Sequence, residues 1–425
     1  MGGVFTHRLG VFNSSAALTG FGIAQFDLGT STGTLNVTDT DLGGITPVAA
    51  IMIATQHRQS QDPQTSGTCG LSVGFYDGTT DYSAGIFAEN NQATANSNRK
   101  NSTAFYDIFS SVGSDGYGSG TSFIADGIRI TRDNATSLDY TGFMLMLAGA
   151  GWQAAVGTTN MGNTTPLSVD VTAPGFEPDV VILLKAGDTN VAPTTGPTVD
   201  ANFEFGICVN DGADTQHAMS WAQDDLNGSG AARQGVWNNC ISKRVSAFSG
   251  NQLWTITCGT FDASGFTLTT DTAAGSQEYI WIALKNAGKS FKLLPFDSPV
   301  ATGSYAITGA GFQPSFGLAV TTNLEAVNPV GAITADATLM AGLGISAFTT
   351  LTEKAASLTM SDDGSSVTQS DVKTYALQCE NGTDRTASGD PLQRATLTSF
   401  DSDGLTFNYS PAPSATKKGF MLLVS

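Results

Sequence analysis

The chain has 425 residues, 40% of them hydrophobic and 13% charged, so it can build cores of domain size and is not disordered as a whole. Its 19 basic and 37 acidic residues give a formal net charge of −18, and Lys and Arg form no cluster that would bind phosphates. We therefore expect neither nucleic acid nor a membrane as a partner. Gly, Thr, Ser, Asn and Asp separate short apolar runs, which predicts an all-β chain.

Residues 1–17 have no counterpart later in the chain. They lack the basic start, apolar run and small-residue cleavage site of a signal peptide. Two interpretations stay open. The segment is an arm that docks on a larger assembly through Phe5, Leu9 and Phe12, or it is the first strand of the domain that follows.

From residue 18 onward, three landmarks recur in one order with a period of roughly 135 residues. They are a Gly-x-x-Pro turn before a strand, an alanine in a middle strand, and an aromatic-to-glycine turn near the end. The turns begin at Gly44, Gly175 and Gly311, and at Phe123, Phe261 and Phe400, and the alanines are Ala84, Ala218 and Ala356. The pattern predicts three tandem β-sandwich, jelly-roll-like domains from an internal triple repeat, at 18–150, 151–288 and 289–425.

Each predicted domain closes with a strand that is apolar on both faces: 141–149, 278–288 and 418–425. One face would fill the domain's own core. The other would meet the matching faces near an axis relating the three units, or meet another subunit, because a soluble chain rarely exposes such a stripe. The alternative is that a loop or second sheet covers it within each domain. The residues of this second face are Met144, Met146, Trp281, Ala283, Met421 and Leu423.

The second predicted domain carries the most regular motifs: "GFEPDVV" at Gly175, "FDASGFTL" at Phe261 and "YIWIALKNAG" at Tyr279. This pattern resembles an uncharacterised repeat of structural proteins of tailed bacteriophages, marine phages in particular, where it is frequent in tail-fibre-like chains. The first domain departs most from it, with Ile45 and Ile124 at motif positions. The motifs are turns and strands and indicate no chemistry.

The resemblance implies a non-enzymatic virion component, displayed on the particle surface as a capsid decoration or as part of a tail fibre or tail tip. Its partners would be major capsid or tail proteins, with self-association as a further possibility. The five cysteines, an odd number without close pairs, fit a protein made and assembled in a reducing host cytoplasm.

A search for chemistry gives few candidates. Of the three histidines, His7 and His57 lie in stretches without strand pattern, and the nucleophile-elbow and phosphate-loop motifs are missing. His217 with Cys208, Cys240 and Cys258 formally makes a zinc set, but no Cys-x-x-Cys pair occurs. We expect buried, unpaired thiols there, and no catalytic residue or cofactor.

Acidic or amide pairs recur at one repeat position: Asn90–Asn91, Asp224–Asp225 and Asp362–Asp363. Two carboxylates adjacent in the chain do not make the facing pair that glycosidases need. Loops such as "SDDGSS" and "FDSDG" could bind Ca²⁺, but turns capped by Asp fit them better.

The alternative function is a lectin-like module that recognises a host surface glycan, with or without weak glycan hydrolysis. Its basis is the concentration of tryptophans in the second domain, since aromatic faces bind sugars. Tryptophans at strand spacing more often fill a core, which we expect for Trp221, Trp237, Trp254 and Trp281.

Overall fold

The computed structural model describes residues 20–56, 68–89, 96–110, 113–186, 201–223, 232–245, 252–272, 276–327, 341–360, 369–379 and 393–425. These residues form thirty strands and one short 3-10 helix, Thr40–Leu42, so the all-β prediction is confirmed. Within these ranges, no helix is long and apolar enough to cross a bilayer.

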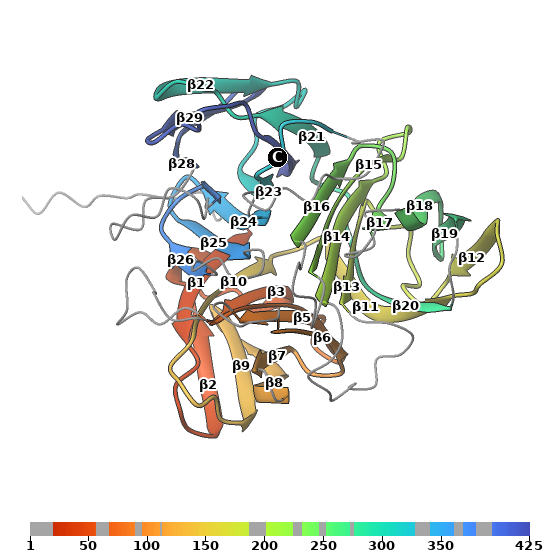
Figure 1. Ribbon diagram of the computed structural model, residues 1–425, viewed down its shortest axis with the longest axis vertical. Coiled ribbons are helices and arrows are strands. Elements are labelled where there is room, and N and C mark those ends of the chain that lie inside the picture. Colours follow the sequence, from red (N-terminus) through yellow and green to blue (C-terminus); the bar gives the residue numbers. More distant parts are fainter. Residues whose placement is uncertain are drawn as a thin grey trace, which may run out of the picture.

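The first ten strands form two antiparallel sheets, and we call them the first unit (Figure 1). The six-stranded sheet has the order β1 (Phe21–Asp27), β10 (Thr141–Ala148), β3 (Pro47–Thr55), β4 (Thr68–Tyr76), β5 (Asp81–Glu89), β6 (Asn96–Ser102). The four-stranded sheet has the order β2 (Gly33–Thr38), β9 (Gly127–Asn134), β8 (Gly113–Ile124), β7 (Tyr106–Ser110).

The second unit has the same two sheets. Its six-stranded sheet is β11 (Trp152–Met161), β20 (Gln277–Asn286), β13 (Val180–Ala186), β14 (Ala201–Val209), β15 (Thr215–Gln223), β16 (Ala232–Trp237). Its four-stranded sheet is β12 (Leu167–Val171), β19 (Gly265–Thr272), β18 (Gln252–Asp262), β17 (Ser242–Val245).

The third unit repeats this order once more. The six-stranded sheet is β21 (Phe291–Asp297), β30 (Lys418–Val424), β23 (Phe316–Thr322), β24 (Ala341–Thr349), β25 (Glu353–Met360), β26 (Gln369–Lys373). The four-stranded sheet is β22 (Gly303–Thr308), β29 (Gly404–Tyr409), β28 (Gln393–Asp401), β27 (Leu377–Cys379). One strand order thus occurs three times, while the origin of the units in a sequence repeat and their bounds at 18, 151 and 289 stay predictions.

The closing strands β10, β20 and β30 occupy the second position of their sheets, between two hydrogen-bonded neighbours. Every residue of β10 is buried, and so is almost every residue of β20 and β30. A strand inside a sheet that is covered on both faces needs apolar residues at successive positions, which explains the absence of polar alternation.

Within each unit a glycine lets the two sheets approach closely. Gly74, Gly206 and Gly344 lie on β4, β14 and β24, where the backbone that leads into or forms the last strand of the smaller sheet passes over them. A Cβ at these positions would lie 1.8, 1.7 and 1.8 Å from the carbonyl oxygens of Phe105, Ile241 and Gln378. Only glycine fits, because no real side chain tolerates such a contact.

Candidate functional site

The feature that the fold presents most clearly is a central apolar core to which all three units contribute. It is built from one face of each six-stranded sheet, and its members come from all three closing strands. They include Phe143, Leu145 and Leu147 of β10, Ile280, Ile282 and Leu284 of β20, and Phe420, Leu422 and Val424 of β30. Since each unit buries apolar residues against the other two, the three units form one block.

The structure corrects our assignment of the two faces of these strands. Met144 and Met146 lie in the first unit's own sandwich core, Trp281 and Ala283 in the second, and Met421 and Leu423 in the third. The opposite face forms the contact between units. Of the two alternatives for this face, the second is therefore confirmed: the smaller sheet of each unit covers it, and the contact near an axis is wrong for Met144, Met146, Trp281, Met421 and Leu423.

Aromatic rings from the first strand of each unit meet in this core. Phe21 of β1 contacts Trp152 of β11 edge to face at 5.6 Å, and Trp152 contacts Phe291 of β21 in the same way at 6.0 Å. Phe21 also stacks on Phe316 of β23, with centroids 4.4 Å apart, and Lys289 lies 5.7 Å over its ring. Phe21, only 1% exposed, thus contacts both other units and is the natural position at which to test their coupling.

Turns around this core bind each unit to the next. In the first unit, the turn between β4 and β5 contains Asp77, whose Oδ1 accepts from the N–H groups of Thr79 and Thr80. The other carboxylate oxygen accepts from the N–H of Val156 on β11, at 2.9 Å. One side chain therefore shapes its own turn and holds the second unit.

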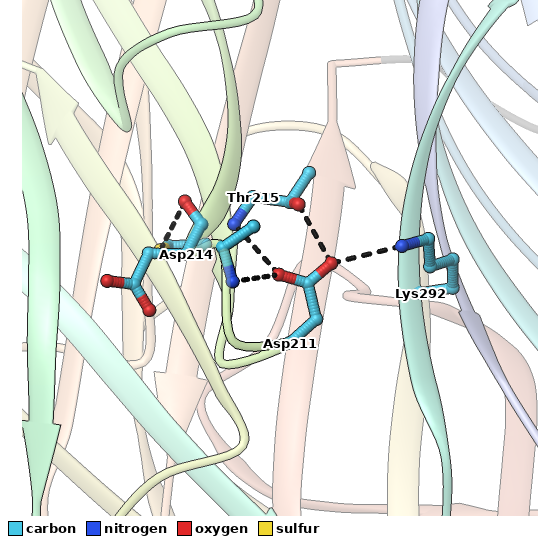
Figure 2. Close-up of polar contacts among 6 residues, drawn as sticks. Asp211, Asp214, Thr215 and Lys292 are labelled. Carbon is cyan, nitrogen blue, oxygen red and sulfur yellow. Dashed lines mark hydrogen bonds and ion pairs between the residues drawn. The ribbon is translucent and has the colours of Figure 1, made fainter.

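Asp211 does the same between the second and third units (Figure 2). Its Oδ1 accepts from the N–H groups of Ala213 and Thr215, and its Oδ2 from the Thr215 hydroxyl at 2.8 Å and from Nζ of Lys292 on β21 at 3.1 Å. Burial alone would raise the pKa of Asp211, but the hydrogen bonds from Thr215 and Lys292 outweigh it and lower the pKa. The carboxylate is thus held in its charged form.

The third unit returns to the first and closes a ring. In the turn between β24 and β25, the Thr349 hydroxyl accepts from the N–H of Thr352, and the Thr352 hydroxyl donates to Asp41 at 3.2 Å. Lys354 of β25 donates to the Gln25 side chain of β1 at 2.9 Å. The same turn in each unit therefore contacts the start of the next, as in a cyclic trimer with head-to-tail interfaces.

The second unit carries a buried charged cluster around Lys185 inside its sandwich. Lys185 is fully buried and lies 4.9 Å over the Tyr279 ring, and its cross-strand neighbour is Glu204. Glu204 accepts from the Ser242 hydroxyl and from Trp254 Nε1. Burial raises the pKa of Glu204, and the positive charge of Lys185 opposes the shift. Such a pair is costly to bury and strongly destabilising to break, so it fixes this end of the sandwich.

In the other two units a phenylalanine of the first strand lies against this part of the closing strand. Opposite Phe26 and Phe296 the closing strands have Gly142 and Gly419, where an added Cβ would lie 2.6 and 2.5 Å from the rings. In the second unit the large side chain, that of Tyr279, lies on the closing strand instead of the first strand. In each unit a large side chain on one of these two strands thus lies opposite a smaller residue on the other, so that the interior is filled.

Polar side chains of β6 connect this end of the second unit to the first. Asn101 accepts from the N–H of Ala186 at 2.7 Å and donates to the carbonyl of Glu278 at 3.3 Å. With its oxygen turned toward two guanidinium groups, the Asn202 side chain accepts from Arg99 of the first unit and from Arg244 of the second. In the sequence, the signal for this region is a charged residue inside an apolar strand, Lys185 in "VVILLKA".

The four residues of the formal zinc set do not come together. Cys208 and Cys258 lie in the second unit's sandwich core and Cys240 in a separate small cluster, while His217 stacks on Phe420 of the third unit at 5.6 Å. The prediction of buried, unpaired thiols is confirmed for these three cysteines. Among the residues with described positions, no group of three His, Cys, Asp or Glu side chains could hold a metal ion.

The other predicted positions divide into turns and residues outside the described ranges. Asp262 accepts from the N–H groups of Ser264 and Gly265 and so caps its own turn, as expected. Asp403 accepts instead from the N–H of Gly311, in a turn 92 residues away in the chain. Outside the described residues lie Phe5, Leu9, Phe12, His7, His57, the three acidic or amide pairs and the loop "SDDGSS".

The prediction that Trp221, Trp237, Trp254 and Trp281 fill cores is confirmed. Trp152 is buried as well, at 8% exposed, so none of the five tryptophans offers a platform for a sugar. Comparisons with family models, with curated proteins and with solved structures find no match to this chain.

Proposed function

We propose that the chain is a non-enzymatic structural component of a tailed-phage virion, displayed on the particle surface as one rigid block of three β-sandwiches. The observation that carries the proposal is the central core, to which each six-stranded sheet contributes. An apolar core shared between units makes them move together, as a particle component under mechanical load requires.

Two further features support this proposal. The ring of turn contacts gives a single chain the geometry of a closed trimer, which fits a block inserted into a symmetric particle. The motifs at Gly175, Phe261 and Tyr279 add the resemblance to phage structural repeats. The lectin-like alternative loses its main argument with the burial of the tryptophans, and no other observation favours it.

Gold labelling tests the proposal. Particles purified from a lysate that produces the chain are labelled with an antibody against it and viewed by electron microscopy. Label over the head indicates a capsid decoration whose partner is the major capsid protein, and label restricted to the tail indicates a tail-fibre or tail-tip component. If neither intact nor opened particles carry label, the virion assignment is wrong.

A further inference from the structure

The first strand of each four-stranded sheet has a free edge. β2, β12 and β22 pair with β9, β19 and β29 on one side, and on the other side the described residues provide no neighbouring strand. In Figure 1 these three strands lie at three outer corners of the molecule. Free edges present unpaired N–H and C=O groups to which another strand can add.

The edge of β12 carries half-buried apolar residues. Its inward-facing Leu167 and Val169 are only half-buried, whereas their pairing partners on β19 include the fully buried Leu268. Asp170, on the outer face of β12, is exposed and carries the only charge of the strand. The edge therefore offers apolar surface on one face and a negative charge on the other.

The free edges of β2 and β22 differ in charge from that of β12. Arg129 and Arg132 on β9 pair with positions of β2, and the Arg129 side chain donates to Asn36. β22 contains no charged residue. A basic strand would thus prefer β12.

Residues 4–12 have the sequence of such a strand. In an extended strand, Phe5, Leu9 and Val11 point to one face, and Arg8 points to the other together with Val4 and Phe12. Residues 1–19 contain no acid in a chain of net charge −18. Nine extended residues span about 30 Å, enough to cover the five residues of β12.

We propose that residues 4–12 of a second copy of this chain add to the free edge of β12 as a fifth strand. Phe5, Leu9 and Val11 then cover Leu167 and Val169, and Arg8 lies on the face of Asp170. A second copy fits better than the same molecule, because β1 begins in the central core while β12 lies at an outer corner (Figure 1). Residues 13–19 would reach at most about 25 Å. The inference does not depend on the virion assignment.

Sedimentation velocity over a range of concentrations tests the proposal. The full chain should associate, and removal of residues 1–13 should leave a folded monomer with an unchanged far-UV circular dichroism spectrum. Arg8→Glu and Asp170→Lys should each weaken association about tenfold, and the double variant should restore it, since the charges are then exchanged. Asn36→Lys on β2 is the matched control and should change nothing.

Three results would overturn the proposal. They are a full chain that is monomeric at every concentration, association that survives removal of residues 1–13, or an Asp170→Lys variant that associates as well as the control. The charge exchange keeps the test valid if the shortened chain fails to fold.

Discussion

Replacement of Phe21 by Ala tests whether the three units unfold as one. The ring is 1% exposed and contacts Trp152 and Phe316, which belong to the other two units. Removing a buried Phe costs about 3–5 kcal/mol, because apolar contacts are lost and a cavity remains. We expect a loss of about 4 kcal/mol for Phe21→Ala.

In scanning calorimetry, this loss lowers Tm by an amount that depends on how many residues unfold together. At about 2.1 cal/mol/K per residue, unfolding of all 425 residues together has an entropy of about 0.9 kcal/mol/K, so Tm falls by about 4–5 °C. If a unit of about 130 residues unfolded alone, the same loss would lower its Tm by about 15 °C and leave the other units unchanged. We expect one transition with the smaller shift.

The matched control is Phe105→Ala, since Phe105 is fully buried in the first unit's own sandwich core. It should lower the same single transition by a similar amount. Separate transitions in the unmodified protein, or a shift confined to one of several transitions, would refute the shared core as the source of cooperativity. A Tm unchanged by Phe21→Ala would also refute the shared core as the source of cooperativity.

Three other variants test local features. Burial lowers the pKa of His217 to about 4, so the native protein should lose up to about 3 kcal/mol as pH falls from 6.5 to 4, and His217→Phe, which keeps the stack on Phe420, should abolish this loss in urea titrations. Burial raises the pKa of Asp81 to about 6. The contribution of its protonated carboxyl to the free energy of unfolding is therefore fully present below pH 4 and is lost as pH rises through 6. Asp81→Asn should therefore stabilise by about 1 kcal/mol at pH 8, after screening of this partly exposed group, and by nothing at pH 4. Gly206→Ala should cost more than about 3 kcal/mol in the same titrations, since its Cβ would collide with the carbonyl of Ile241.

The sequence predicts the fold class and identifies the closing strands as buried on both faces, because apolar residues at successive positions have no other use in a soluble sheet. It does not reveal which face meets the other units. Trp281 and Ile282 are neighbours on β20, point to opposite faces and are both apolar. The alternation therefore shows which residues share a face, but not what each face packs against. Only the packing of whole sheets decides this.

Cross-strand partners are equally hidden. Lys185 and Glu204 lie on the consecutive strands β13 and β14 and become neighbours only through the register of these strands. Asp77 and Asp211 are each followed by glycine and lie in turns, but nothing in the local sequence shows that each carboxylate also holds the next unit. Long-range electrostatic contacts of this kind follow from topology, which the local pattern does not contain.

The ring in which the last unit returns to the first has a genetic consequence. In a homotrimer, one codon change alters three equivalent positions at once, so a charged pair that one subunit tolerates must be tolerated in all three. In this chain each third of the ring has its own codons. Lys185 and Glu204 can therefore occupy one sandwich while Phe26 and Phe296 fill the other two. Covalent linkage keeps the symmetric architecture and frees each part of it to change alone.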